Sequence, residues 1–144
     1  LRRYASNPIE DILRLFDLIA FNYIIGNCDA HLKNYSLIRS DDWRELSLAP
    51  AYDLVSTTVY SELTTAMGLY VGEKKRLEAV ERADFVELGH SMGLSRRAAE
   101  TRIDMLRDRV VAAFEAQAAD SADSEIARAI ACQSKKRIEK LAVV

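Results

Sequence analysis

The chain carries the stretch GNCDAHLKN at residues 26–34 and the stretch APAYDLVS at residues 49–56. In the first stretch, Asp29 and Asn34 stand five residues apart, and Asp53 follows Asn34 after nineteen residues. An acid, an amide and a second acid are thus concentrated in a short part of a chain of 144 residues. No other part of the sequence has a comparable set of chemically active side chains.

The segment between the two stretches predicts a β-hairpin. Tyr35–Arg39 and Trp43–Leu48 are short runs of strand-forming residues, and the polar residues 40–42 supply the turn between them. A hairpin returns the chain close to its starting point. We therefore expect Asp53 to face Asn34.

An amphipathic helix leads into residues 26–34. Asn7 can cap its start, Pro8 suits the first helical position, and Glu10 completes a capping box. Gly26 supplies the natural stop. The apolar residues recur at helical spacing and predict one buried stripe: Ile9, Ile12, Leu13, Phe16, Ile19, Ala20, Tyr23 and Ile24.

The second half of the chain is predicted to be helical. A brief extended segment at residues 69–71 precedes a helix from Arg82 to Met92. Ser95 can cap a second helix, and a break at residues 120–123 precedes a third. The expected inward faces of these last two helices carry Ile103, Leu106, Val110 and Phe114, and then Ile126, Ile130, Ile138 and Leu141. The fold class is therefore mainly α, in one domain over residues 1–144.

Composition excludes several classes of protein. The net charge is −2 and the pI is near 5.7, without the basic excess of a nucleic-acid-binding domain. Short basic runs at residues 74–76, 96–97 and 135–137 have acidic neighbours and are interpreted as solvated helix faces. No signal peptide or membrane-spanning stretch is recognisable, and two cysteines do not make a disulfide scaffold. We expect a cytoplasmic protein with reduced thiols and no membrane contact.

The residue types at 26–34 and 53 suit phosphoryl transfer. That reaction needs a carboxylate within reach of the attacking hydroxyl and hard oxygen ligands for magnesium. Asp29 is the candidate base, and Asn34 and Asp53 are the candidate ligands. Lys33 could contact the transferring phosphoryl group or Asp29, and His31 could orient the loop through a hydrogen bond to a backbone carbonyl or to Asp53.

Taken together, the two stretches resemble the C-terminal catalytic region of HipA-type serine/threonine kinases, the toxins of bacterial toxin–antitoxin pairs. The G-N-x-D-x-H-x-K-N loop and the Y-D metal motif of that family are both intact. The resemblance implies a kinase-like C-terminal lobe with the hairpin beside the catalytic loop. It also implies Mg²⁺ and ATP as cofactors, a protein hydroxyl as the phosphate acceptor, and an antitoxin partner. It assigns catalysis to Asp29, and metal and nucleotide binding to Asn34 and Asp53.

The family further implies an N-terminal lobe that grips the nucleotide. The chain has no Gly-rich loop, and it opens on Leu-Arg-Arg rather than Met, which suggests a piece of a longer protein. We therefore expect the full-length parent to be the kinase. For the chain alone we expect weak ATP affinity and little turnover.

Four alternatives stay open at this stage. The chain could be a non-catalytic module that binds an antitoxin. Residues 85–110 have the layout of a helix-turn-helix DNA reader, although Glu100 and Asp104 follow the basic start of its second helix. Residues 28–31 and Asp53 could hold a transition metal, and Asp29 and Asn34 could simply form turn hydrogen bonds. Trp43 is expected to pack in the hairpin.

Overall fold

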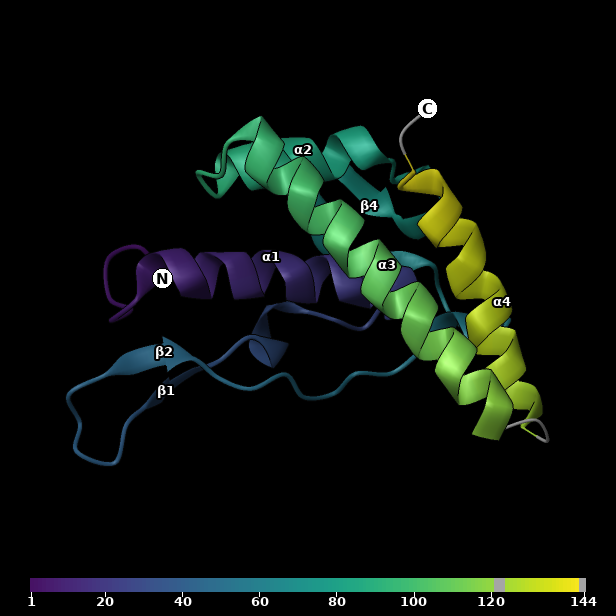
Figure 1. The fold of residues 1–144 in the computed structure, drawn as a ribbon, viewed down its shortest axis with the longest axis horizontal. Coiled ribbons are helices and arrows are strands. Elements are labelled where there is room, and N and C mark those ends of the chain that lie inside the picture. The colour runs from purple at the N-terminus through teal and green to yellow at the C-terminus, as the bar shows by residue number, and fades with distance from the viewer. Residues whose placement is uncertain (121–123, 143–144) are drawn as a thin grey trace.

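Four helices and two short hairpins make up the part of the chain that the computed structural model describes, residues 1–120 and 124–142 (Figure 1). The helices are α1 (Pro8–Ile25), α2 (Arg82–Ser91), α3 (Arg96–Asp120) and α4 (Glu125–Lys140). The hairpins pair β1 (Leu37–Arg39) with β2 (Leu46–Leu48), and β3 (Ala66–Val71) with β4 (Lys74–Arg76). Short 3-10 turns are η1 (Leu32–Asn34), η2 (Thr57–Val59) and η3 (Leu77–Ala79). The predicted mainly α fold is confirmed.

Helix α1 begins and ends where its sequence predicts. Asn7 Oδ1 accepts a hydrogen bond from Glu10 N at 3.5 Å, and Asn7 Nδ2 donates to Glu10 Oε2 at 2.8 Å. The Glu10 carboxylate therefore accepts from the side-chain amide of Asn7 and not from its backbone N–H, as it would in a capping box. At the other end, Gly26 adopts a left-handed conformation with φ 76°, which glycine adopts without steric cost. The loop at residues 26–34 thus starts from a fixed helix end.

The predicted hairpin is confirmed, although its strands are shorter than expected. Leu37 pairs with Leu48, and Arg39 with Leu46. Trp43 lies in the turn with φ 62° and a side chain that is 74% exposed, beneath the Arg39 guanidinium at 5.6 Å from the ring centroid. The expectation that Trp43 packs in the hairpin is wrong, because no element of the described chain covers the turn.

The core lies where α1 meets α2, α3 and α4. Phe85 of α2 contacts the rings of Phe16 and Tyr23 edge-on, at centroid distances of 6.3 and 5.3 Å. The Tyr23 hydroxyl donates to Val80 O at 3.2 Å, and burial raises the pKa of this phenol to about 12. Ile103 and further apolar side chains of α3 and α4 close the core.

Two residues of the predicted stripes lie outside this core. Ile9 is 74% exposed and Ile126 is 57% exposed, so their assignment to the buried faces is wrong. Each stands in the first turn of its helix, and Figure 1 shows both helix starts at the periphery of the molecule. Periodicity identifies the face of a helix, but it does not show how far along that face another element extends.

The connections between the last three helices also follow the sequence signals. Ser95 Oγ accepts from Ala98 N at 3.1 Å at the start of α3, and Ser124 Oγ accepts from Ala127 N at 3.2 Å at the start of α4. The predicted break at residues 120–123 lies mostly outside the described residues. Over the ranges 1–120 and 124–142, no helix has the length and apolar character needed to cross a bilayer.

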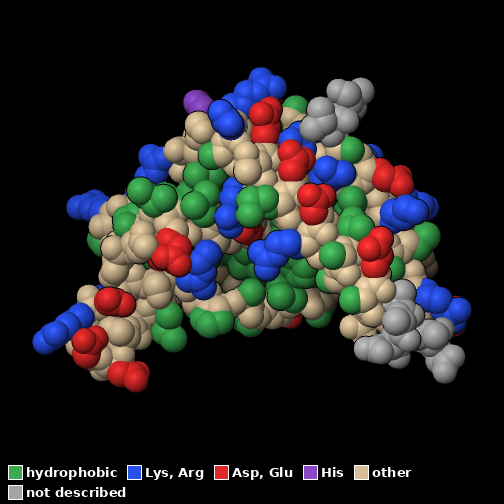
Figure 2. Space-filling model, in the orientation of Figure 1, with side chains coloured by type: hydrophobic (Ala, Val, Ile, Leu, Met, Phe, Trp, Pro, Cys, Tyr) green, Lys and Arg blue, Asp and Glu red, His purple; other side chains and the backbone are tan. Residues whose placement is uncertain are grey.

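The α2–turn–α3 unit is packed onto the rest of the fold. Arg96 Nε contacts Glu100 Oε1 at 2.9 Å, and Arg102 forms an ion pair with Asp17 of α1. One of the two arginines that motivated the DNA-reader hypothesis is therefore already paired within its own helix. Figure 2 shows acidic and basic side chains interspersed on the viewed face, without a patch of one sign.

Candidate active site

Asn27 is the central hydrogen-bonding residue of the candidate site. It directly follows the C-cap Gly26, and its side chain is buried, with 4% of the residue exposed. Its Nδ2 donates to Asn22 Oδ1 and to the backbone carbonyl of Asp53, both at 2.9 Å. Its Oδ1 accepts from the N–H of Asp29 at 3.1 Å. One amide therefore fixes α1, the backbone of Asp29 and the backbone of Asp53 relative to one another.

Asn34 and Asp53 meet as the hairpin predicts. Asn34 Nδ2 donates to Asp53 Oδ2 at 2.9 Å and lies 3.5 Å from the backbone carbonyl of Asp29. Asn34 belongs to η1, a single 3-10 turn that turns its side chain back toward Asp29. The two side chains come together because the hairpin at 37–48 brings the chain back to its start.

Asp53 has an unusual backbone conformation, with φ 56°. This left-handed region disfavours most side chains but is tolerated by aspartate. The surroundings hold it there, because Asn27 binds the Asp53 carbonyl and the neighbouring Tyr52 hydroxyl donates to Lys33 O at 2.6 Å. The Tyr52 hydroxyl also lies 2.9 Å from Ser36 Oγ. Together with the contact between Asn34 and Asp53, three hydrogen bonds thus join the segment that carries Asp53 to the loop at residues 26–34.

The carboxylate of Asp29 is exposed and forms no hydrogen bond or ion pair with any residue in the described ranges. Its backbone, in contrast, is held on both sides, since its carbonyl accepts from His31 N at 2.7 Å. A rigid backbone with an uncommitted carboxylate is what a proton acceptor for an incoming hydroxyl requires. Lys33 is exposed and forms no ion pair with Asp29.

His31 does not make the orienting hydrogen bond that the sequence suggested. Its Nδ1 is buried and has no partner among the described residues. The loop is instead bound to strand β3, where Gly68 N donates to Cys28 O at 2.8 Å. A Cβ at position 68 would lie 2.7 Å from His31 N, so only glycine allows the strand to approach the loop this closely.

Thr57 of η2 supports the start of the loop. Its Oγ1 donates to Gly26 O and accepts from Cys28 N, both at 3.0 Å. Burial raises the pKa of the Cys28 thiol, and the hydrogen bond with Thr57 opposes that shift only in part. Burial in the loop therefore favours the neutral form of the Cys28 thiol.

Helix α4 contacts both the C-terminal end of α1 and the segment that follows Asp53. Arg137 Nε donates to Ile24 O at 2.8 Å, at the C-terminal end of α1. Gln133 Nε2 donates to Thr58 O at 3.1 Å, in the segment that follows Asp53. The basic run at residues 135–137 was interpreted as a solvated face. That is wrong for Arg137, which is only 9% exposed.

The predicted proximity of Asn34 and Asp53 is confirmed, but the residues that hold the loop were not predicted. Asn27 could have been suspected, because a polar residue directly after a buried helix end must satisfy its amide. Tyr52, Thr57 and Arg137 carry no such signal, since their roles depend on contacts between distant segments.

The donor set suits magnesium better than a transition metal. Asn34 and Asp53 offer amide and carboxylate oxygens, the hard ligands that Mg²⁺ prefers. Within the ranges 1–120 and 124–142, no group of three or more His, Cys, Asp or Glu side chains is arranged to hold a metal ion. The alternative of a structural zinc site at residues 28–31 gains no support from this geometry.

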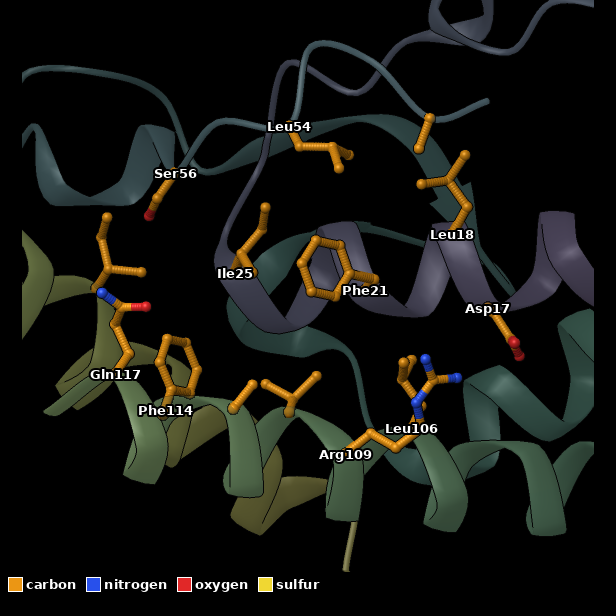
Figure 3. Close-up of a pocket in the computed structure, with 14 residues that line it drawn as sticks. Asp17, Leu18, Phe21, Ile25, Leu54, Ser56, Leu106, Arg109, Phe114 and Gln117 are labelled. Atoms are coloured by element: carbon orange, nitrogen blue, oxygen red, sulfur yellow. The ribbon is translucent and has the colours of Figure 1, made fainter. Parts of the chain in front are cut away.

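A cavity of about 690 Å³ lies behind the segment that carries Asp53. Figure 3 shows Phe21 and Ile25 of α1, Leu54 and Ser56 of that segment, and Leu106 and Phe114 of α3 around it. Its walls are mainly apolar, and Figure 2 shows hydrophobic side chains gathered in a hollow on this face. Asp53 thus stands between a polar loop on one side and an apolar cavity on the other.

The described chain is a mainly α domain with two short hairpins, and comparison with known proteins identifies its family. Residues 1–114 match the family described as HipA-like C-terminal domain. The chain therefore belongs to this family.

Relatives and a solved structure agree with this assignment. The chain is 32% identical over 123 residues to the protein named "Putative kinase Y4mE" of Sinorhizobium fredii, covering 85% of the chain and 29% of that protein. It is 30% identical over 70 residues to the serine/threonine-protein kinase toxin HipA of Shewanella oneidensis, covering 49% of the chain and 16% of that protein. The chain thus spans less than a third of the length of either relative.

The structural neighbour shows the same fold at lower sequence identity. A chain in the complex of HipA, HipB and operator DNA from Shewanella oneidensis superposes with a TM-score of 0.75 and 20% identity. The match covers 95% of the present chain and 32% of that chain. At this identity the likeness supports the fold alone.

Proposed function

We propose that this chain provides the catalytic base and the magnesium ligands of a serine/threonine protein kinase that acts as the toxin of a toxin–antitoxin pair. One observation carries the proposal. Asn34 and Asp53 meet at 2.9 Å beside the exposed and uncommitted carboxylate of Asp29. The kinase names of the relatives support the same reading.

In this proposal Asp29 accepts the proton of a protein serine or threonine hydroxyl. The hydroxyl oxygen forms a bond to the γ-phosphorus of ATP, the bond between that phosphorus and the β–γ bridging oxygen breaks, and ADP leaves. Magnesium, when bound, supplies charge neutralisation on the phosphate oxygens. Asn34 and Asp53 are the residues that would hold it, and their side chains are already adjacent.

The other predicted site residues have supporting roles. Lys33 is exposed next to Asn34, where its cation can contact a phosphoryl group. His31 has a buried Nδ1 without a partner among the described residues, and its place in the site stays a prediction. Asn27 and Tyr52 keep the base and the second acid at fixed positions.

The test is a phosphoryl-transfer assay on the complete product of the gene that encodes this chain, with a generic protein substrate and labelled ATP. Asp29→Asn removes the proton acceptor while keeping size and backbone contacts, and we expect the rate to fall roughly 10²- to 10⁴-fold. Asp41→Asn is the matched control, because Asp41 is an exposed acid in the hairpin turn. Equal rates for the Asp29 variant and the Asp41 control would refute the assignment of the base.

The same protein tests the metal ligands separately. Asp53→Ala should weaken binding of Mn²⁺, used as a paramagnetic substitute for Mg²⁺ in the presence of ATP. Asp29→Asn should leave Mn²⁺ binding nearly unchanged. If both substitutions weakened Mn²⁺ binding equally, the separation of base and ligand roles would be wrong.

An antitoxin partner is the second part of the proposal. It is supported by the structural neighbour, which was solved together with HipB and operator DNA. Co-purification of the complete gene product with the protein encoded beside it would test this directly. A role as a non-catalytic binding module would be favoured if the partner bound tightly while the phosphoryl-transfer assay stayed negative.

A further inference from the structure

A second cavity, of about 420 Å³, lies between α4 and the segments that follow the candidate site. One wall is a single face of α4, since its residues recur at helical spacing: Gln133, Lys136, Arg137 and Lys140. The other lining residues come from α1, η2, η3 and the residue before β3: Tyr23, Thr58, Thr65, Leu77 and Glu78. The cavity does not include Asp29, Asn34 or Asp53, so it is separate from the proposed kinase site.

Arg137 is a buried cation without a carboxylate partner in the described ranges. Its Nε is satisfied by Ile24 O at 2.8 Å, whereas its Nη2 is buried and has no hydrogen-bond partner. Burying a charge without a counter-charge is costly, and native proteins normally compensate it. Burial lowers the pKa of this guanidinium, and the nearby groups that oppose the shift are a phenol and a thiol.

The rest of the cavity does not supply the missing negative charge. Lys136 and Lys140 add two cations, of which Lys140 already donates from Nζ to the backbone carbonyl of Glu78. Among the described residues, Glu78 is the only acid that lines the cavity. The carboxylate of Glu78 is already engaged, because its Oε1 accepts from Arg76 Nε at 2.7 Å. Thr58 Oγ1 is buried and has no partner either, and it is therefore a second unused polar group in the wall.

We propose that this cavity is a binding site for a phosphate dianion, either inorganic phosphate or the phosphomonoester of a phosphorylated side chain. The guanidinium of Arg137 can donate from Nη2 and the hydroxyl of Thr58 from Oγ1, two groups that lie together beside Gly26, and Lys136 supplies a second positive charge. Arginine and lysine pair strongly with phosphate oxygens in such partly desolvated places. A dianion matches the excess of positive charge better than a single carboxylate.

Binding of inorganic phosphate to this chain, measured by calorimetry at low ionic strength and without magnesium, tests the proposal. The decisive comparison is Lys136→Ala against Lys135→Ala. The two lysines are neighbours on α4, both are exposed, and only Lys136 lines the cavity. We expect Lys136→Ala to weaken phosphate binding about five- to tenfold. Lys135→Ala should change it less than twofold.

Amide chemical shifts locate the bound ion and separate the two sources of phosphate. On titration with phosphate, the signals of Thr58 and Arg137 should move, and those of Asp29 and Asn34 should not. Titration with a short phosphoserine peptide and its unphosphorylated form then shows whether a phosphorylated side chain occupies the same place. Tighter binding of the phosphoserine peptide than of inorganic phosphate would identify the side chain as the ligand, and the reverse order would identify the free ion.

Several outcomes would overturn the proposal. These are undetectable binding at a phosphate concentration of about 10 mM, which is about ten times a millimolar Kd, equal weakening by both lysine substitutions, or shifts confined to Asp29 and Asn34. The variant Asp53→Ala keeps this test independent of the kinase proposal, because it removes a proposed metal ligand and leaves the cavity intact. Unchanged phosphate binding by that variant supports a separate site.

Discussion

At the scale of single residues, the candidate site depends on buried amides and hydroxyls more than on its exposed acids. Asn27 makes three hydrogen bonds from one side chain, and each reaches a different segment. Asp29, in contrast, contributes to the fold only through its backbone. Substitutions at these two kinds of position should therefore have opposite effects on stability and on chemistry.

Comparing Asn27→Ala with Asn34→Ala tests whether the buried amide stabilises the fold more than the less buried one does. Asn27→Ala leaves buried partners without hydrogen bonds, and we expect the free energy of unfolding to fall by about 2–4 kcal/mol. Asn34 is more exposed and has its main bond to Asp53, so the same substitution there should cost roughly 1 kcal/mol or less. Urea unfolding of the two variants measures both values. An equal loss in both would mean that Asn27 is not the central residue of the loop.

Local contacts within the site could be predicted from the sequence, whereas contacts between distant segments could not. The spacing of Asp29, Asn34 and Asp53 sufficed to place Asn34 against Asp53, because a hairpin has a simple local geometry. The role of Arg137 could not be predicted, because its partner Ile24 is 113 residues away in the chain. A basic residue beside two lysines looks solvated unless the three-dimensional contact is known.

At the scale of elements, α2, α3 and α4 meet at one arginine. Arg82 of α2 donates from Nη1 to Asp104 of α3 and to the carbonyl of Leu141 after α4, both at 2.7 Å. Arg107 adds a contact to the same carboxylate at 3.3 Å. Helical periodicity predicted these helices, but it carried no information about the polar junction that fixes their relative positions.

This junction should make stability depend on pH. The hydrogen bond from Arg82 holds the pKa of Asp104 below its ordinary value. A carboxyl with a lowered pKa in the folded state stabilises the fold above its unfolded pKa, near 4, and this contribution is lost as the pH falls further. Between pH 5 and pH 3, Asp104→Asn should therefore lose less stability than the unsubstituted chain.

Thermal unfolding at several pH values measures this difference. Asp41→Asn serves as the control, because Asp41 is exposed in the hairpin turn and has no part in the junction. A pH dependence that is identical in the unsubstituted chain and in the Asp104 variant would show that the junction contributes nothing through this carboxyl. The difference should be small, because Asp104 is partly exposed and solvent screens the interaction.

At the scale of the whole molecule, the two cysteines report on different parts of the fold. Cys28 is buried in the loop at residues 26–34, and Cys132 is exposed on α4. The thiolate is the reactive form, and burial raises the pKa of Cys28. A thiol reagent at pH 8 should therefore label Cys132 rapidly, and Cys28 only when the loop opens.

Mass spectrometry after timed labelling measures the two rates. Cys132→Ser removes the fast signal and leaves the slow one, so the opening of the loop can be followed alone. A slow rate that increases in parallel with urea unfolding would show that the loop opens only with the whole fold. Rapid labelling of both thiols would contradict the burial of Cys28.

The match to the family ends at residue 114. Gln133 and Arg137 lie beyond it, in α4. They donate hydrogen bonds to the segment after Asp53 and to the end of α1. The presence of the motif residues therefore does not by itself ensure that the site keeps its geometry. A homologue could keep every residue of GNCDAHLKN and the acid at position 53, and still lose the site's geometry through changes in its last helix. Searches that rank relatives by motif alone would not detect such a loss, and α4 is the first place to inspect when a chain with an intact motif proves inactive.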